Sequence, residues 1–304
     1  MGLIRICFLL LTCLVAAQAK PVVVATDTVL ADITRTIAGD ELDVRCLLPV
    51  GIDPHSYEPT PADVRLLAHA DLVIENGLGL ESWSRKLVAQ SGYKGRVVQA
   101  GQNLPHPVFV EAGHDHNHQH EHDEHEHTTG QIDPHAWHDV RNVQHFVVVI
   151  AEALRVRFPG SAAAIEGNAA AYTSELSKLH SYAAEQLGSI PPERRKLATS
   201  HDSLRYLAHA YGLQIVPIAG LQPQREPSAK ELAALIKRIR AEKVRAVFFE
   251  GTSNPKLSRV VAEEANLPVL ESLYTDSLGA EGSSGATYLG MFRSNVDTLV
   301  RALR

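Results

Sequence analysis

Residues Gly51 to Asp63 read G-I-D-P-H-S-Y-E-P-T-P-A-D and place a single histidine, His55, on a turn. The residues before this turn, D-V-R-C-L-L-P, predict a buried strand, and Pro61 begins a helical pattern. Outward from here, short apolar runs alternate with helical patterns, which predicts parallel sheets flanked by helices, the α/β class. In such sheets ligands bind beyond the carboxyl ends of the strands, where we expect His55 to lie.

The N-terminus has the pattern of a secretory signal peptide. Arg5 precedes an apolar run that is too short to span a membrane as a helix, and Ala17 and Ala19 form an A-x-A cleavage pattern. We therefore expect residues 1–19 to be removed by cleavage after Ala19, with the mature chain in the periplasm. A lipid anchor at Cys13 is the weaker alternative, because a threonine precedes this cysteine where a small residue is expected.

Composition excludes several other classes of protein. After cleavage Cys46 is the one cysteine left, so no disulfide can form within a chain. The basic residues are scattered and the net charge is −6, so the sequence shows no basic patch for nucleic acid. The exported chain, roughly 285 residues long, is sufficient for two domains of ordinary size.

One long helical pattern divides the chain into two halves. Residues 160–188 carry apolar side chains at the three-and-four spacing of a helix face, which predicts a single connecting helix. Residues 20–159 predict an N-terminal lobe, and residues 189–304 repeat the same alternation as a C-terminal lobe. Within the first lobe, residues 105–130 have no periodic apolar pattern and are rich in His, Asp and Glu, so we expect a mobile loop.

Four residues have metal-binding side chains in similar positions. His55, His201 and Asp276 follow predicted strands, and His135 lies between the loop and a helix. Imidazole nitrogens and carboxylate oxygens are ligands that zinc accepts, four at a time in a structural site. An Asp-Pro pair precedes both His55 and His135, and this aspartate can orient the imidazole. Taken singly, each of the four has a commoner explanation as a solvated, core or helix-capping residue.

Four motifs around these residues resemble those of the metal-binding receptors of ABC transporters for zinc and manganese, the group with a rigid connecting helix. The motifs are the stretch quoted above, D-P-H-A-W-H-D, S-H-D-S-L-R-Y-L-A-H-A-Y-G-L and L-Y-T-D-S-L-G. The resemblance covers essentially the whole exported chain. It implies two (β/α) lobes with one high-affinity metal site between them, formed by His55 and His135 from one lobe and His201 and Asp276 from the other.

The chain also departs from the pattern of that family. Val140 stands where the second motif usually carries proline, and His138 is an unusual neighbour that offers an alternative ligand. The cysteine pair common in the second lobe of zinc members is absent, which removes a covalent link but not the metal site.

The ligand set favours zinc as the transported ion. Three imidazoles and one carboxylate suit zinc or another late transition metal, whereas manganese prefers oxygen donors. Copper binds such sites more strongly than zinc, so availability in the cell decides between them. The alternative within the same family is a receptor for manganese or iron.

A histidine tract lies inside the expected loop, with carboxylates between the imidazoles. On a flexible loop it would provide many loose and interchangeable sites, so we expect it to capture zinc at low affinity and pass it to the high-affinity site. The alternative is a solvated acidic linker. The histidines of the tract are His114, His116, His118, His120, His122, His125 and His127.

The sequence favours a binding protein over an enzyme. No H-E-x-x-H is present, and the H-x-x-E-H from His118 to His122 is a chance product of the tract. Four protein ligands leave no position for the activated water of a zinc hydrolase, which is the competing class. The resemblance implies an ABC permease as membrane partner. We expect a monomer. A metallochaperone is a further candidate partner, which would load the receptor with metal. Nothing in the sequence beyond secretion supports an adhesin.

Overall fold

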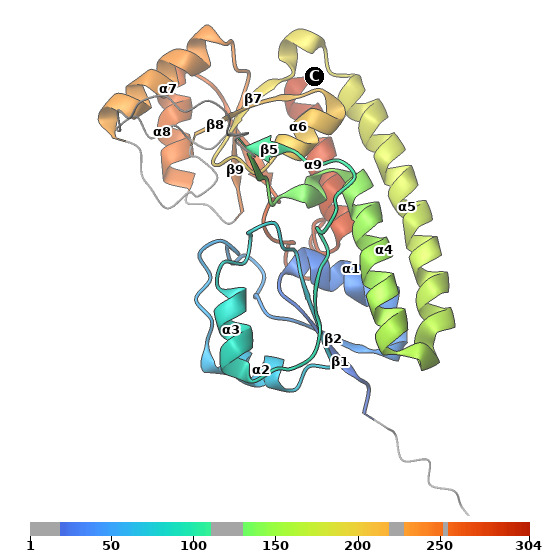
Figure 1. Cartoon of the computed structure of the whole chain (residues 1–304). Coiled ribbons are helices and arrows are strands. Elements are labelled where there is room, and N and C mark those ends of the chain that lie inside the picture. Colours follow the sequence, from blue (N-terminus) through green and yellow to red (C-terminus); the bar gives the residue numbers. More distant parts are fainter. Residues whose placement is uncertain (1–18, 111–129, 219–227, 252–254) are drawn as a thin grey trace, which may run out of the picture.

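The computed structural model describes residues 19–110, 130–218, 228–251 and 255–304. In these residues strands and helices alternate along the chain, and each half forms a four-stranded parallel sheet (Figure 1). The strand order is β2-β1-β3-β4 in the N-terminal half and β10-β9-β7-β8 in the C-terminal half. The strands are β1 (Val22–Ala25), β2 (Asp43–Cys46), β3 (Leu72–Glu75), β4 (Val97–Gln99), β7 (Lys196–Thr199), β8 (Gln214–Pro217), β9 (Val247–Glu250) and β10 (Val269–Leu273).

Helices cover both faces of each sheet. The outer faces are covered by α2 and α3 in the N-terminal half and by α7 and α8 in the C-terminal half. The helices are α1 (Thr28–Ala38), α2 (Pro61–Ala68), α3 (Ser84–Ser91), α4 (Val140–Arg157), α5 (Ala162–Gly188), α6 (Arg205–Tyr211), α7 (Ala229–Ala241), α8 (Pro255–Ala265) and α9 (Tyr288–Leu303), with short 3-10 turns η1 (Gly39–Glu41), η2 (Ala136–His138), η3 (Pro159–Ser161) and η4 (Pro192–Arg194).

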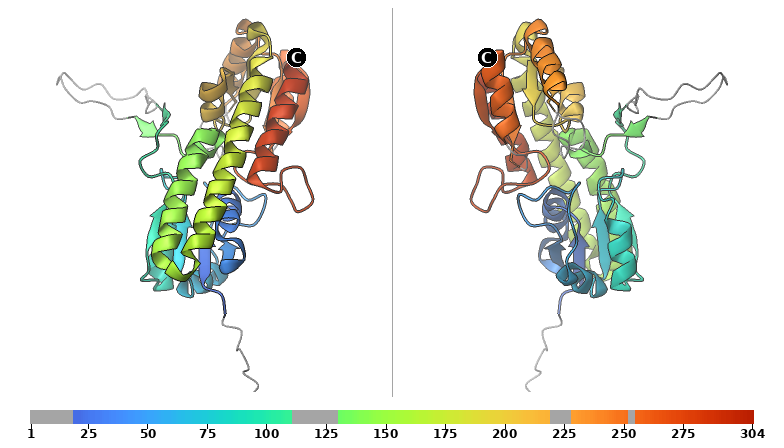
Figure 2. Two further views of the ribbon diagram at one scale, coloured as in Figure 1. Left: turned by 90° about the vertical axis from the view of Figure 1, so that its right-hand side faces the viewer. Right: turned by 90° about the vertical axis from the view of Figure 1, so that its left-hand side faces the viewer.

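The connecting helix α5 runs along both halves of the molecule (Figures 1 and 2). It is 27 residues long, and its alanine-rich sequence has high intrinsic helix propensity. One face carries the side chains that it buries against α1, α4 and α9, as the three-and-four spacing predicts. The expected single connecting helix is therefore confirmed. The buried residues of this face are Ile165, Tyr172, Leu176, Leu179, Ala183 and Leu187.

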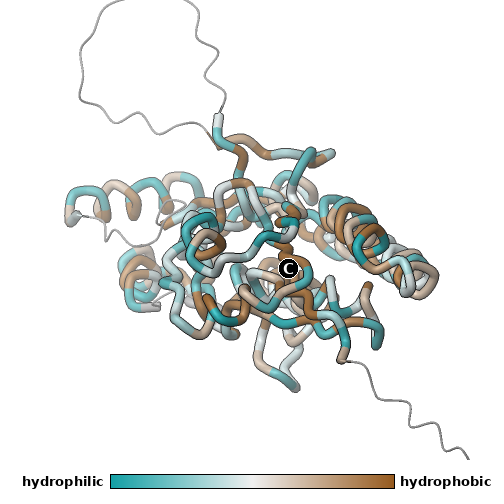
Figure 3. Tube along the Cα trace, turned by 60° about the horizontal axis from the view of Figure 1, so that its bottom comes forward, coloured by the Kyte–Doolittle hydropathy of each residue, from teal (hydrophilic) through white to brown (hydrophobic). Residues whose placement is uncertain are grey.

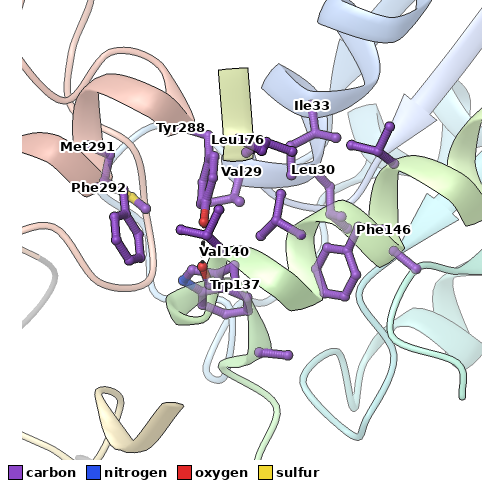
Figure 4. Close-up of a cluster of buried hydrophobic side chains, with 14 of the residues drawn as sticks. Val29, Leu30, Ile33, Trp137, Val140, Phe146, Leu176, Tyr288, Met291 and Phe292 are labelled. Atoms are coloured by element: carbon purple, nitrogen blue, oxygen red, sulfur yellow. Dashed lines mark hydrogen bonds between the residues drawn. The ribbon is translucent and has the colours of Figure 1, made fainter. Parts of the chain in front are cut away.

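The two halves share one hydrophobic core on the side of α5. Val29 from α1, Phe146 from α4, Leu176 from α5 and Phe292 from α9 all belong to the same buried cluster (Figure 4). Buried side chains such as these are costly to separate, because each one loses its close contacts with its neighbours. The shared core therefore holds the two halves in a fixed relation along α5, and smaller separate clusters lie under the outer helices.

The surface helices alternate hydrophobic and hydrophilic positions along the chain, as helices with one buried face do (Figure 3). The outermost helix α7 begins with a capping box, in which Ser228 Oγ accepts from the backbone N–H of Glu231, at 3.3 Å. Among the described residues, no helix combines the length and apolar character needed to cross a membrane.

One short element was not expected from the sequence. Residues 105–130 were predicted to be a loop without regular structure, but β5 (Phe109–Val110) lies within this range. It pairs antiparallel with β6 (Gln131–Ile132), which immediately precedes the D-P-H motif. The prediction is therefore wrong for the start of this range, because two residues are too few to give a periodic signal. Residues 111–129, with the histidine tract, lie outside the described residues, as do residues 1–18 of the expected signal peptide.

Candidate metal site

The structure brings His55, His135, His201 and Asp276 together between the two halves. His55 lies in the loop between β2 and α2, and His135 directly precedes η2. His201 and Asp276 follow the carboxyl ends of β7 and β10. One ligand atom from each of the four lies within 4.8 Å of all the others. Among the described residues, this is the group of histidine, cysteine and acidic side chains with a geometry that could hold a metal ion.

The distances between these atoms suit a single small cation. His55 Nε2 lies 3.0 Å from His135 Nε2, and His201 Nε2 lies 3.1 Å from Asp276 Oδ2. His135 Nε2 lies 3.5 Å from Asp276 Oδ1. In a tetrahedral zinc site with Zn–N distances of about 2.0–2.1 Å, neighbouring ligand atoms lie about 3.3 Å apart. These three contacts are therefore close to the spacing of such a site, and all four ligand atoms lie within 4.8 Å of one another.

Three of the four side chains are inaccessible to solvent. His135 and His201 are 0% exposed and Asp276 is 4% exposed, whereas His55 is only partly buried. A cation held here would be shielded from water on three sides. Access from solvent is therefore greatest on the side of His55.

Carboxylates orient two of the imidazoles. Asp133 Oδ1 lies 2.7 Å from His135 Nδ1, and Glu250 Oε2 forms an ion pair with His201 Nδ1. In both rings the contact at Nδ1 leaves Nε2 directed at the other ligands, the arrangement usual for histidines that bind metals. The contact expected from the Asp-Pro pairs thus forms at Asp133. Asp53 instead accepts from the backbone N–H of His55, at 2.8 Å, and so shapes the turn rather than the ring.

Glu250 is a part of the site that the sequence did not reveal. It ends β9 and is 0% exposed. Its Oε1 accepts from the backbone N–H of His201 at 3.0 Å, and its Oε2 accepts from the hydroxyls of Ser203 at 3.1 Å and Thr275 at 3.0 Å. The available signal was an acidic residue at the end of an otherwise apolar strand, a position where ligands of α/β proteins gather.

The charges of the site are strongly coupled. Burial lowers the pKa of His201, but the carboxylates of Asp276 and Glu250 outweigh burial and raise it well above the usual value of histidine. Burial favours a neutral Asp276, but the neighbouring imidazoles, His201 first, hold its pKa well below the usual range. Burial, and then the proximity of His135, lowers the pKa of His55. The metal-free site therefore holds a proton on His201 beside an ionised Asp276.

His138 lies outside this cluster of four. Its side chain is 0% exposed, and neither ring nitrogen has a hydrogen-bond partner among the described residues. Burial lowers its pKa to about 3, with His135 adding to the effect, so the ring is neutral. The geometry gives no support to His138 as an alternative ligand in this conformation.

A helix cap at Asp139 compensates for the absence of proline at position 140. Val140 is the first residue of α4, a position where proline is favoured because the N–H there has no partner in the helix. Asp139 caps this helix, and its side chain accepts from the backbone N–H of Arg141 at 2.9 Å. The cap satisfies one of the free N–H groups, so the turn that follows His135 can form without proline.

Hydrogen bonds join the segment that carries Asp276 to the N-terminal half. Trp137 Nε1 donates to the carbonyl of Thr275 at 2.9 Å, and the backbone N–H of Gly51 donates to Ser277 Oγ at 2.8 Å. The two contacts flank Asp276 in the sequence. Its carboxylate is therefore held against the N-terminal ligands by bonds that require the two halves to be together.

Comparison with known proteins identifies the family. The family model described as "Zinc-uptake complex component A periplasmic" matches residues 23–302. The chain is 32% identical over 292 residues to the metal ABC transporter substrate-binding lipoprotein FimA of Streptococcus parasanguinis, covering 94% of this chain and 90% of the relative. It is 31% identical over 293 residues to the manganese ABC transporter substrate-binding lipoprotein PsaA of Streptococcus pneumoniae, covering 95% and 90%.

Solved structures agree with the fold. The periplasmic zinc binding protein TroA from Treponema pallidum matches with a TM-score of 0.84 and 29% identity, covering 94% of this chain and 99% of that chain. A manganese-bound periplasmic metal binding protein from Candidatus Liberibacter asiaticus matches with a TM-score of 0.79 and 27% identity, covering 94% and 100%. These relatives confirm the two-lobed α/β fold and a binding protein rather than an enzyme. The chain belongs to this zinc-uptake component A family, the metal-binding receptors of ABC transporters that face the outside of the membrane and supply a membrane permease.

Proposed function

We propose that this receptor carries zinc, binding one Zn²⁺ between His55, His135, His201 and Asp276. The observation that carries the proposal is the convergence of three imidazoles and one carboxylate within 4.8 Å. Neutral imidazoles and an ionised carboxylate bind the ion, and the hydrogen bonds on either side of Asp276 hold the two halves around it. The permease then takes the ion from the receptor.

The names of the relatives do not choose between zinc and manganese. PsaA is named for manganese, whereas TroA is named for zinc and the family model for zinc uptake. The donor atoms of this chain support zinc, because nitrogen donors suit late transition metals and manganese prefers oxygen. The names of the manganese relatives keep manganese as the second candidate.

Changing one donor from nitrogen to oxygen tests the choice of metal. We expect His201→Glu to weaken zinc relative to manganese by roughly tenfold or more, because a harder donor replaces an imidazole. Competition titrations of both metals against a chromophoric chelator would measure the ratio. His209→Glu, at an exposed position of α6, is the matched control and should leave the ratio unchanged. A preference for manganese in the unaltered protein would contradict the zinc proposal.

We also propose that the histidine tract captures zinc at low affinity and passes it to the high-affinity site. The support is the composition of the tract alone, with imidazoles among carboxylates. Deleting residues 113–127 should slow loading when zinc is scarce and leave one tightly bound ion per chain. Stopped-flow transfer from a weak chelator would measure the loading rate. Equal rates with and without the tract would leave only the role of a solvated linker.

The mature protein has two candidate forms, one free in the periplasm and one anchored to the membrane by a lipid. We propose cleavage after Ala19 and a free periplasmic protein, which rests on the A-x-A pattern. The relatives are named lipoproteins, which supports the alternative of a lipid anchor, and Cys13 is the candidate residue. The intact mass of the mature protein distinguishes an N-terminus at Lys20 from an acylated cysteine. We likewise propose that the receptor is a monomer. A metallochaperone is a further candidate partner, for loading the receptor with metal.

A further inference from the structure

A small cavity lies between the two loops that carry His55 and Asp276. It has a volume of about 180 Å³. Val50 and Gly51 line it from the N-terminal half, and Tyr274, Ser277 and Leu278 line it from the C-terminal half. We call it the seam pocket, because the hydrogen bond from the Gly51 N–H to Ser277 Oγ lies in its wall.

The seam pocket is lined by neighbours of two metal ligands, one from each half of the molecule. Gly51 precedes His55 by a few residues in one loop, and Ser277 directly follows Asp276. Gly51 has a φ of +82°, a left-handed conformation that glycine adopts without strain, and no atom lies within 4 Å of a side chain built there. A group inserted into the pocket would therefore push on both of the segments that carry metal ligands.

The loop that carries Val50 presents exposed apolar side chains beside the pocket. Val50 is 51% exposed and Ile52 on the same loop is 40% exposed. The other large exposed apolar residues of the described chain lie on different elements, namely β5, α4 and α8. Exposed apolar side chains grouped beside a depression mark surfaces that bind another molecule.

We infer that the seam pocket receives an apolar side chain of the membrane permease, and that its insertion releases the metal by separating Gly51 from Ser277. This inference rests on the proposed metal site. Three of the four ligands are buried, so the permease must part the two ligand loops before the ion can leave. Docking at the seam supplies that movement, because the hydrogen bond that insertion breaks is one that holds Asp276 near the N-terminal ligands.

The permease is favoured over a second copy of the chain by the size of the pocket. The cavity accommodates one side chain, and the loop beside it adds only two exposed apolar residues, Val50 in the lining and Ile52 two positions further along. A stable dimer needs on the order of 800 Å² of buried surface on each partner. A transient contact with the permease, the membrane partner of receptors in this family, needs much less buried surface.

Val50→Asp tests the inference, with Val156→Asp as its matched control. Val156 is 64% exposed on α4, far from the seam in the sequence, and receives the same change of charge. Cells that lack their own receptor would express each variant of the full chain, and uptake of radioactive zinc would be measured under chelation. We expect Val50→Asp to lower uptake by about tenfold or more, because it puts a charge at the edge of the pocket that the apolar side chain would enter, and Val156→Asp to match the unaltered receptor.

Measurements on the purified proteins separate the possible outcomes. The inference requires that Val50→Asp keep the zinc Kd and the melting temperature of the unaltered protein. Equal uptake by the two variants would overturn it, and so would a weakened zinc Kd in Val50→Asp, which would assign Val50 to the metal site itself. Self-association that Val50→Asp abolishes would assign the surface to a second copy instead. If the unaltered protein binds no zinc, the proposed function fails, and the uptake comparison still reports on docking with the metal that the receptor does carry.

Discussion

Asp276→Asn is expected to abolish high-affinity zinc binding while leaving the fold in place. Asp276 provides the one anionic ligand, and its carboxylate contacts both His201 Nε2 and His135 Nε2 in a buried setting. Asparagine keeps the shape but removes the charge. Removing one partner of a buried charge pair costs about 3–5 kcal/mol, so the Kd should rise by roughly two to four orders of magnitude.

The experiment is sharpest in protein that lacks residues 113–127. The tract could otherwise bind zinc and hide the loss of the high-affinity site. Competition against a tight chelator would give the Kd, and circular dichroism would verify that the variant is folded. Asp40→Asn removes the same charge from an exposed position on η1 and should have no effect. High-affinity zinc binding that survives in Asp276→Asn would show that the ion lies elsewhere.

Much of the fold could be predicted because its signals are local. Each strand is a short apolar run, and the connecting helix carries its buried face at regular spacing over 27 residues. The long helix could be predicted with good boundaries because many residues contribute to one pattern. β5 and β6 escaped prediction because two residues carry almost no pattern, and their pairing depends on partners 23 positions apart at Phe109 and Ile132.

The metal site, like the fold, has some parts that the sequence predicts and others that it does not. His55 and His135 lie in distinctive motifs, so resemblance marked them without any knowledge of the fold. Glu250 lies in no such motif, and its contact with His201 spans 49 positions of the sequence. The contact arises because β7 and β9 are neighbours in the sheet, with Ala198 opposite Val247, so that both strands end beside the site. Such a contact depends on strand order, which the sequence alone did not provide.

Zinc binding is expected to weaken as the pH falls, because the ion must displace a proton from His201. The carboxylates of Asp276 and Glu250 raise the pKa of His201 above its usual value despite burial, so the metal-free protein carries this proton at neutral pH. Below that raised pKa, the Kd should increase about tenfold for each unit of pH for each proton displaced. Calorimetric titrations in buffers of different ionisation enthalpy would count the protons released.

The proton on His201 also affects the stability of the metal-free protein, and this stability changes with pH in the opposite direction to zinc affinity. A histidine pKa that is higher in the folded than in the unfolded chain stabilises the fold at pH values below the unfolded pKa. This stabilisation is lost as the pH rises through the folded pKa. The metal-free protein should therefore lose stability over the range in which zinc affinity increases. Because bound zinc adds stability by mass action, the rise in melting temperature on adding zinc should be larger at higher pH.

Glu250→Gln removes the charge of Glu250 and keeps its contact with the ring of His201. The amide oxygen of glutamine can still accept from His201 Nδ1, whereas the amide nitrogen in the place of Oε1 cannot accept from the backbone N–H of His201, so one hydrogen bond is lost with the negative charge. With one carboxylate fewer, the pKa of His201 should fall. Fewer protons should then be released at neutral pH, and the weakening of zinc binding should begin at a lower pH. An unchanged proton count and pH profile would mean that Glu250 only positions the ring. Replacing the exposed Glu281 with glutamine should change neither quantity.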